Sequence, residues 1–254
     1  MWNTLIIEPM VNALLWIYSL VGNFGVAIIL FTILIRLITH PLTASQVKST
    51  AKMTELQKSK QWQEMQKKYK DDKNKLAAEQ MAMYKELGIN PMGSCLPMLI
   101  QFPIIIGLYQ AVTRAMAASP FQLLDLSKLI YPFINASDLI PLKSQFLWMN
   151  MGQPERLYIF GVGIPVLTIL VVITTYLQSK LMTPPPANPG DQAAQMGKMM
   201  NLYMPLLMGY FAYTLNAGLA LYFVVGNLVG IAQYALLGKL NWRNLLPKKK
   251  AAAK

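Results

Sequence analysis

Residues 24–39 read FGVAIILFTILIRLIT, an apolar run that contains one charged side chain, Arg36. Pro41 follows, and a proline disfavours helix at the residue before it, so we expect the helix to stop there. A charge at the centre of a lipid-facing helix costs about 2.5–3.5 kcal/mol on insertion scales. The run therefore predicts a membrane helix whose arginine either reaches the membrane surface or lies in a polar environment.

The composition of the whole chain agrees with this reading. Hydrophobic residues make up 54% of the 254 residues and charged residues only 13%, against roughly a quarter charged in ordinary soluble domains. A soluble core of this size does not hold so much apolar surface, so part of it must face lipid. We predict an all-α integral membrane protein with five transmembrane helices and a cytoplasmic amphipathic helical hairpin between the first and the second.

Apolar runs, prolines and charge clusters divide the chain into ten segments. These are an interfacial N-terminal helix (1–22), a first span (23–41), a cytoplasmic helical hairpin (42–93), a second span (94–116), an external loop (117–156), a third span (157–180), a cytoplasmic proline-rich loop (181–198), a fourth span (199–216), a fifth span (217–238) and a basic cytoplasmic tail (239–254). An open alternative is that residues 3–20 extend the first span. The helix of the third span is expected to begin at about Leu157, and that of the fourth at Met199.

Residues 42–88 are rich in good helix formers, Lys, Gln, Glu, Ala and Met. Met53, Leu56 and Lys60 fall at helical spacing, and Asp71-Asp72 interrupts the middle of the segment. This pattern predicts two amphipathic helices folded into a hairpin. The external loop, with several prolines, is expected to contain short helices.

Basic residues set the expected orientation. Residues 40–93 contain ten lysines and residues 239–254 six basic residues, whereas the first 35 residues contain none. The positive-inside rule then places the N-terminus outside and the C-terminus in the cytoplasm, and five spans satisfy this arrangement. The N-terminus shows neither a signal-peptide nor a transit-peptide pattern, which favours a bacterial plasma membrane.

The inventory of reactive residues excludes several classes of enzyme. With one cysteine, Cys95, and one histidine, His40, the chain forms no internal disulfide and no Cys/His metal cluster. The predicted spans contain no aspartate for an aspartyl protease, and no phosphate-binding loop occurs. We expect no enzymatic activity, no cofactor and no metal.

Polar residues recur within the predicted spans. Gly25, Thr32, Arg36 and Thr39 share one helical face, which suits a wet cavity better than lipid, although Arg36 is also close enough to the cytoplasmic end to reach the surface. Other spans contribute Gln101, a face with Thr168, Thr175 and Gln178, and another with Asn227, Gly230 and Gln233. Each is alternatively an interhelical hydrogen bond worth about 0.6 kcal/mol, and Gly226 and Gly230 form a small-xxx-small packing pair.

Three stretches resemble the YidC family of membrane insertases. They are Gly22-Asn23-Phe24-Gly25-Val26-Ala27-Ile28-Ile29 continuing through Thr32 and Arg36 to Pro41-Leu42, then Asn90-Pro91-Met92-Gly93-Ser94-Cys95-Leu96-Pro97-Met98-Leu99-Ile100-Gln101-Phe102-Pro103-Ile104 with Leu108-Tyr109, and Gly218-Leu219-Ala220-Leu221-Tyr222 with Asn227-Leu228 and Gln233. The resemblance implies a five-helix core and a hydrophilic groove, closed to the outside but open to cytoplasm and lipid. It places Arg36 and Gln101 along this groove, and also Asn227 and Gln233. Thr32 and Thr175, from the polar faces, complete the expected substrate-binding set.

The chain departs from the family pattern where Lys58 replaces a frequent proline and where Phe223 replaces a frequent tryptophan. It begins at the core, so we expect a short form without the large external domain of some relatives. The resemblance implies an insertase and chaperone for nascent membrane proteins, with the ribosome, the signal recognition particle pathway and the Sec translocon as further partners beside the bilayer. A transporter or channel and a non-catalytic membrane scaffold are the alternatives.

Overall fold

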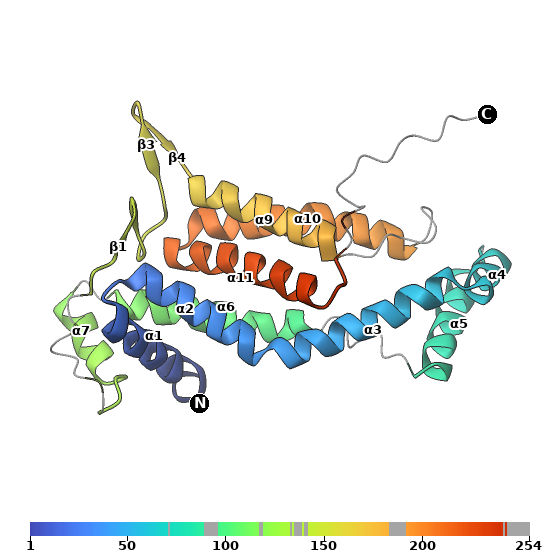
Figure 1. Cartoon of the computed structure of the whole chain (residues 1–254), viewed down its shortest axis with the longest axis horizontal. Helices are drawn as coiled ribbons and strands as arrows, with labels where there is room; N and C mark the ends of the chain where they lie inside the picture. The colour runs from blue at the N-terminus through green and yellow to red at the C-terminus, as the bar shows by residue number, and fades with distance from the viewer. Residues whose placement is uncertain are drawn as a thin grey trace.

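The structure is a computed structural model. It describes residues 1–70, 72–88, 96–116, 119–132, 134, 139, 142–182, 192–240 and 242. Most of these residues are helical. In Figure 1, α5 (Lys73–Glu86) and α7 (Pro120–Ser127) lie across the two ends, and the helices that run lengthwise are α2 (Phe24–Ile38), α3 (His40–Lys58), α6 (Leu96–Ala115), α9 (Val166–Met182), α10 (Gln192–Thr214) and α11 (Ala217–Leu236).

Six long helices form one apolar bundle. They are α1 (Glu8–Val21), extended at its start by the π-helix η1 (Asn3–Ile7), α2 (Phe24–Ile38), α6 (Leu96–Ala115), α9 (Val166–Met182), α10 (Gln192–Thr214) and α11 (Ala217–Leu236). Helix α11 contributes the longest series of buried residues, from Ala217 to Tyr234, and packs against α2, α6, α9 and α10. It is therefore the helix around which the polar residues of the bundle must be arranged.

Two of these helical segments, Asn3–Val21 and Ala217–Leu236, are long and apolar enough to cross a membrane. A third span results if α2 and the next helix, His40–Lys58, are counted as one span that is bent by 55°. Two shorter apolar helices cover Leu99–Ala115 and Val166–Met182. Within the described residues, length and composition thus support two or three spans, against the five expected.

The N-terminal helix and the first predicted span are separate helices. Gly22 ends α1 in the left-handed conformation at φ 67°, which glycine adopts without steric cost. The Asn23 side chain then accepts a hydrogen bond from the Val26 amide and caps α2. The alternative that residues 3–20 merely extend the first span is therefore wrong, while the interfacial placement of this helix stays a prediction.

Beyond α2 the chain forms three helices rather than the two expected: α3 (His40–Lys58), α4 (Lys60–Lys68) and α5 (Lys73–Glu86). Ser59 takes an extended conformation and caps α4 through the Trp62 amide, which splits the first expected helix. Trp62 is buried against Leu56, Met65 and Tyr84 in a small apolar cluster that is separate from the core of the bundle. Burial raises the pKa of the Tyr84 hydroxyl, and a hydrogen bond with Gln57 lowers it in part.

The expected all-α architecture is wrong at two short β-hairpins between residues 145 and 164. They pair β1 (Gln145–Phe146) with β2 (Met149–Asn150) and β3 (Leu157–Ile159) with β4 (Val162–Ile164), both antiparallel. Helix α7 (Pro120–Ser127) precedes them in the chain.

The β3–β4 hairpin also corrects the start of the third span, which was expected at about Leu157. Phe160 and Gly161 connect the two strands, and both have positive φ (51° and 83°), as a two-residue turn matched to strand twist requires. Helix α9 begins only at Val166, directly after Pro165. Helix α10 shows the opposite error, since it begins at Gln192, inside the expected proline-rich loop, rather than at Met199. The remainder of that loop, residues 183–191, lies outside the described residues.

A buried carboxylate ties these hairpins to the bundle. Glu155 is 3% exposed, and its two oxygens accept hydrogen bonds from Trp148 Nε1 at 2.8 Å and from the Leu167 amide at 3.0 Å. The Leu167 amide belongs to the first turn of α9, whose N–H groups lack partners within the helix. Glu155 therefore fixes where α9 starts relative to the two hairpins.

We expect Glu155→Ala to lower the free energy of unfolding by about 1.5–3 kcal/mol, the contribution of hydrogen bonds to a charged group. Unfolding of the purified protein by added SDS in mixed micelles measures this change. The control is Asp125→Ala, because the Asp125 carboxylate is about half exposed in a surface ion pair and should cost less than about 1 kcal/mol. Equal costs for the two variants would contradict the anchoring role of Glu155.

Candidate functional site

The guanidinium of Arg36 lies against two glycines of α11. A Cβ atom added at Gly226 would come within 3.0 Å of Arg36 Nη2, and one added at Gly230 within 3.9 Å of Nη1. Glycine at these two positions, one helical turn apart, leaves the room that the planar guanidinium occupies. Any larger side chain at Gly226 would displace the charge, so these glycines determine where it sits.

The backbone of Arg36 is held by the same helix. Gln233 Nε2 donates a hydrogen bond of 2.8 Å to the carbonyl oxygen of Arg36. Arg36 lies in the last turn of α2, where carbonyl groups lack a partner within the helix. The Thr39 hydroxyl also donates to this carbonyl, at 3.4 Å, but the shorter bond comes from Gln233, which is only 5% exposed and joins the end of α2 to α11.

Two buried polar atoms at this junction have no hydrogen-bond partner among the described residues: Arg36 Nε and Gln233 Oε1. A buried donor or acceptor without a partner costs about 1–3 kcal/mol, and more when it is charged. None of the helices α2, α6, α9, α10 and α11 contains Asp or Glu. The positive charge of Arg36 is therefore not neutralised by these helices, and its Nε–H group remains able to donate.

Gln101 enters the same region through Tyr222. Gln101 Nε2 donates to the Tyr222 hydroxyl at 2.8 Å, and Tyr222 is 1% exposed. Tyr222 precedes Gly226 by one turn on the same face of α11. The structure thus brings Arg36, Gln101 and Gln233 to one stripe of α11, from Tyr222 to Gln233.

The remaining expected site residues make other contacts. Asn227 Nδ2 donates to Thr174 Oγ1 at 3.0 Å and to Thr175 Oγ1 at 2.8 Å, which joins α11 to α9. Thr32 is fully buried, and its hydroxyl donates to the Ile28 carbonyl of its own helix at 2.6 Å. These contacts agree with the alternative interpretation from the sequence, in which the polar groups form hydrogen bonds within or between helices. Their role in a groove stays a prediction.

Sequence reasoning did not assign Tyr222, Gly226 and Gly230 to the site, although it noted the spacing of the two glycines. Gln178 of α9 belongs to the same contact, because a Cβ at Gly230 would come within 2.6 Å of its Nε2. The pair Gly226-x-x-x-Gly230 was interpreted as a helix-packing motif, and the spacing alone does not tell which side chain fills the gap. Within the described residues no group of three or more His, Cys, Asp or Glu is positioned to hold a metal ion.

Comparison with known proteins relates this geometry to a family. The family model described as 60Kd inner membrane protein matches residues 16–243, most of the chain. The chain belongs to this family. Proteins similar to this chain are named membrane protein insertases, and the resemblance to the YidC family expected from the sequence is confirmed.

Relatives differ in how much of their length this chain covers. The chain is 35% identical to "Membrane protein insertase MisCA" of Bacillus subtilis (strain 168), covering 93% of this chain and 78% of that protein. It is 35% identical to "Membrane protein insertase YidC 2" of Listeria innocua, covering 93% and 71%. It is also 35% identical to "Membrane protein insertase YidC" of Syntrophobacter fumaroxidans, covering 91% of this chain and 37% of that relative.

A solved structure supports the same fold. The crystal structure described as an active YidC insertase with its first transmembrane domain resolved matches with a TM-score of 0.57 and 26% identity. The match covers 91% of this chain and 46% of that one. The helical bundle described above is therefore that of a membrane protein of this family.

Proposed function

We propose that this protein inserts nascent membrane proteins into the bilayer through a hydrophilic groove in which Arg36 attracts acidic residues of the translocated segment. The observation that carries the proposal is a guanidinium seated on the glycines of α11, with an unpaired Nε and no carboxylate in the surrounding helices. The names of its relatives support the same activity. Thr32, Gln101, Thr175, Asn227 and Gln233 would line this groove with Arg36.

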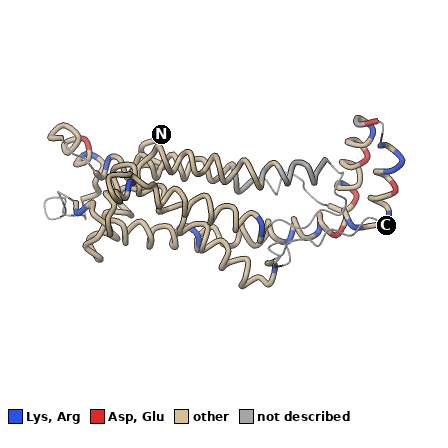
Figure 2. The backbone as a smooth tube through the Cα atoms, turned by 90° about the horizontal axis from the view of Figure 1, so that it is seen from above, with Lys and Arg blue, Asp and Glu red and all other residues tan. Residues whose placement is uncertain are grey.

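Orientation follows from the distribution of charge. Figure 2 shows charged residues concentrated at the end of the molecule that holds α3–α5, while the middle of the bundle is nearly free of them. The positive-inside rule places that end in the cytoplasm. In this proposal α2, α6, α9, α10 and α11 are the five spans of a bacterial plasma membrane protein, with the N-terminus outside and the C-terminus inside.

The physical task is to move a short polar segment across hydrocarbon. A carboxylate without a partner is costly to bury, and a wet groove shortens the dry part of its path. The apolar helix of the substrate then leaves sideways into lipid, and its burial supplies the driving free energy without nucleotide. The basic cytoplasmic end suits contacts with the ribosome and with nascent chains delivered by the signal recognition particle pathway or shared with the Sec translocon.

Proteoliposomes that contain only this protein test the proposal. The substrate is a small single-span protein with an acidic N-terminal tail, and insertion is scored by protection of that tail from external protease. We expect insertion well above protein-free liposomes, and a smaller gain for a substrate whose tail acids are replaced by asparagine and glutamine. Equal insertion with and without the protein would contradict the proposal and favour a transporter, channel or scaffold instead.

A further inference from the structure

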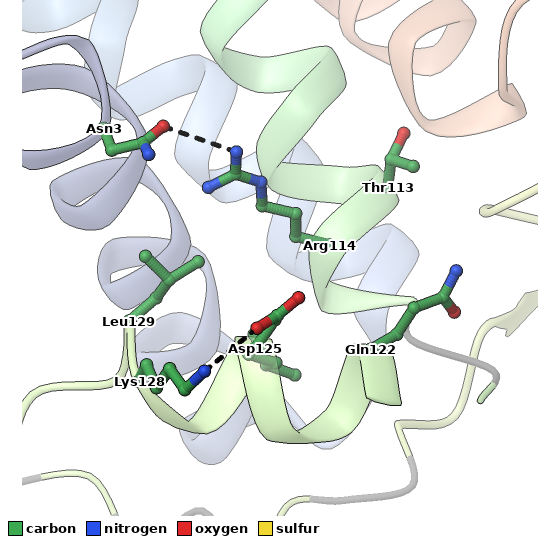
Figure 3. A pocket seen from close by; sticks show the side chains of 8 residues that line it. Asn3, Thr113, Arg114, Gln122, Asp125, Lys128 and Leu129 are labelled. Atoms are coloured by element: carbon green, nitrogen blue, oxygen red, sulfur yellow. Dashed lines mark hydrogen bonds and ion pairs between the residues drawn. The ribbon is translucent and has the colours of Figure 1, made fainter. Parts of the chain in front are cut away.

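At the end of the bundle opposite α3–α5, the structure has a cavity of about 380 Å³ between η1, the C-terminal end of α6, and α7. Figure 3 shows Arg114 and Lys128 among the side chains that line it, together with the carboxylate of Asp125. Leu126, which is 1% exposed, and Leu129 supply apolar lining. None of these residues takes part in the Arg36 site.

We propose that this cavity binds the headgroup of an anionic phospholipid of the phosphatidylglycerol type. Arg114 and Lys128 together with Asp125 give the cavity a formal net charge of +1, which complements one phosphodiester. The headgroup hydroxyls would donate to the Asp125 carboxylate, while the phosphate accepts from the two cations. Arg114 suits this contact because its planar fork of N–H donors matches phosphate oxygens.

The present partners of these side chains are weak enough to exchange. Arg114 Nη2 donates to Asn3 Oδ1 at 3.3 Å, a neutral acceptor. Lys128 Nζ lies 3.3 Å from Asp125 Oδ1, but both side chains are more than half exposed, and exposed ion pairs contribute little, about 0–1 kcal/mol. A phosphate that contacts both cations therefore replaces contacts of small net value.

Position favours a membrane lipid over a soluble anion. Thr113 and Arg114 end the apolar helix α6, which is where a membrane helix meets the headgroup layer. Trp2 Nε1 donates to Gln110 Oε1 one turn below, and tryptophan is enriched at this interface. The elements η1 and α7, which line the cavity, also carry exposed apolar side chains, Leu5 (72%), Phe121 (73%) and Leu124 (54%), on which acyl chains would lie.

The test measures lipid binding to the full-length protein in a neutral detergent by native mass spectrometry. Phosphatidylglycerol, phosphatidylethanolamine and phosphatidylcholine of equal chain length are compared for wild type, Arg114→Gln/Lys128→Gln and Lys143→Gln. Lys143 is an exposed lysine between α7 and β1 that does not line the cavity. We expect one phosphatidylglycerol per chain to bind with at least about tenfold preference over phosphatidylcholine, a preference that the double variant loses and Lys143→Gln retains.

Two further arms keep the result decisive. Lys128→Gln alone changes an exposed side chain, so it tests the site even if the double variant fails to fold, and we expect an approximately fivefold weaker binding. Inorganic phosphate added at millimolar concentration should leave the bound phosphatidylglycerol in place. Displacement by phosphate, equal binding of all three lipids, or unchanged binding by both cavity variants would each overturn the assignment to a lipid headgroup at this cavity.

Discussion

Arg36→Ala is expected to reduce insertion of a substrate with an acidic translocated tail by at least about fivefold, whereas Arg36→Lys keeps most of the wild-type yield. Two unit charges about 4 Å apart interact by about 1 kcal/mol in water and about 4 kcal/mol at an effective dielectric of 20. A wet groove lies between these limits, and each 1.4 kcal/mol is a factor of ten. Lysine keeps the charge but loses the planar fork of donors, so it is expected to rescue in part.

The contacts of Arg36 separate this effect from a loss of folding. Gln233 bonds to the backbone carbonyl of Arg36, which every substitution at this position retains. Arg36 Nε has no partner among the described residues, so its removal breaks no hydrogen bond there. SDS unfolding of the alanine variant measures the packing lost against Gly226 and Gly230 separately from insertion, and we expect the variant to remain folded while insertion falls.

The matched control for charge is Lys143→Ala, which removes an exposed cation between α7 and β1, far along the chain from Arg36. It should insert acidic and neutral tails as wild type does. If Arg36→Ala inserts several acidic substrates as well as wild type, Arg36 serves as an anchor that reaches the membrane surface, and the electrostatic proposal fails.

Local sequence signals predicted those parts of the fold that depend on neighbouring residues. Asn216 caps α11 by accepting a hydrogen bond from the Leu219 amide, and the predicted boundary between the fourth and fifth spans, 216/217, coincides with this cap. The polar face around Arg36 was readable because side chains four residues apart lie on one side of a helix. The separation of α1 from α2 at Gly22 and Asn23 uses equally local residues, but their capping role was not recognised.

Features that depend on long-range contact were not predictable in this way. Residues 157–164 are apolar, and a short apolar run does not distinguish a strand from the start of a buried helix. The bond from Gln233 to Arg36 joins residues 197 positions apart, and periodicity carries no information about which helix faces which. The same limit hid the role of Gly226, because the glycine spacing predicts close approach without naming the group that approaches.

Gly226→Leu is expected to lower insertion of acidic substrates to about the level of Arg36→Ala, although Arg36 itself is unchanged. Even the Cβ of a new side chain would lie 3.0 Å from Arg36 Nη2, closer than ordinary van der Waals contact. The guanidinium is the end of a flexible side chain, so it moves aside at small cost and the helix packing survives. The guanidinium of Arg36 is then displaced from its position against α11, while the net charge of the protein is unchanged.

Gly230→Leu gives a graded comparison at the next turn of the same face. Its Cβ would meet Gln178 Nε2 at 2.6 Å and Arg36 Nη1 only at 3.9 Å, so we expect a smaller loss of insertion than for Gly226→Leu. The control Leu228→Phe adds bulk to α11 at a residue that is 53% exposed, and it should insert as wild type. Proteoliposome insertion measures all three variants, with SDS unfolding to check that each is folded.

Gly226→Ala distinguishes the effect of moving the Arg36 charge from the effect of destabilising the protein. Alanine exceeds glycine in helix propensity by about 1 kcal/mol, so the helix itself gains stability while the added methyl group pushes the guanidinium by a few tenths of an ångström. If the groove requires the charge at a defined place, the variant unfolds at the same or higher SDS concentration and inserts acidic tails less well. If Gly226→Ala and Gly226→Leu both insert like wild type, a charge anywhere near α11 suffices, and Gly226 serves only the packing of α2 against α11.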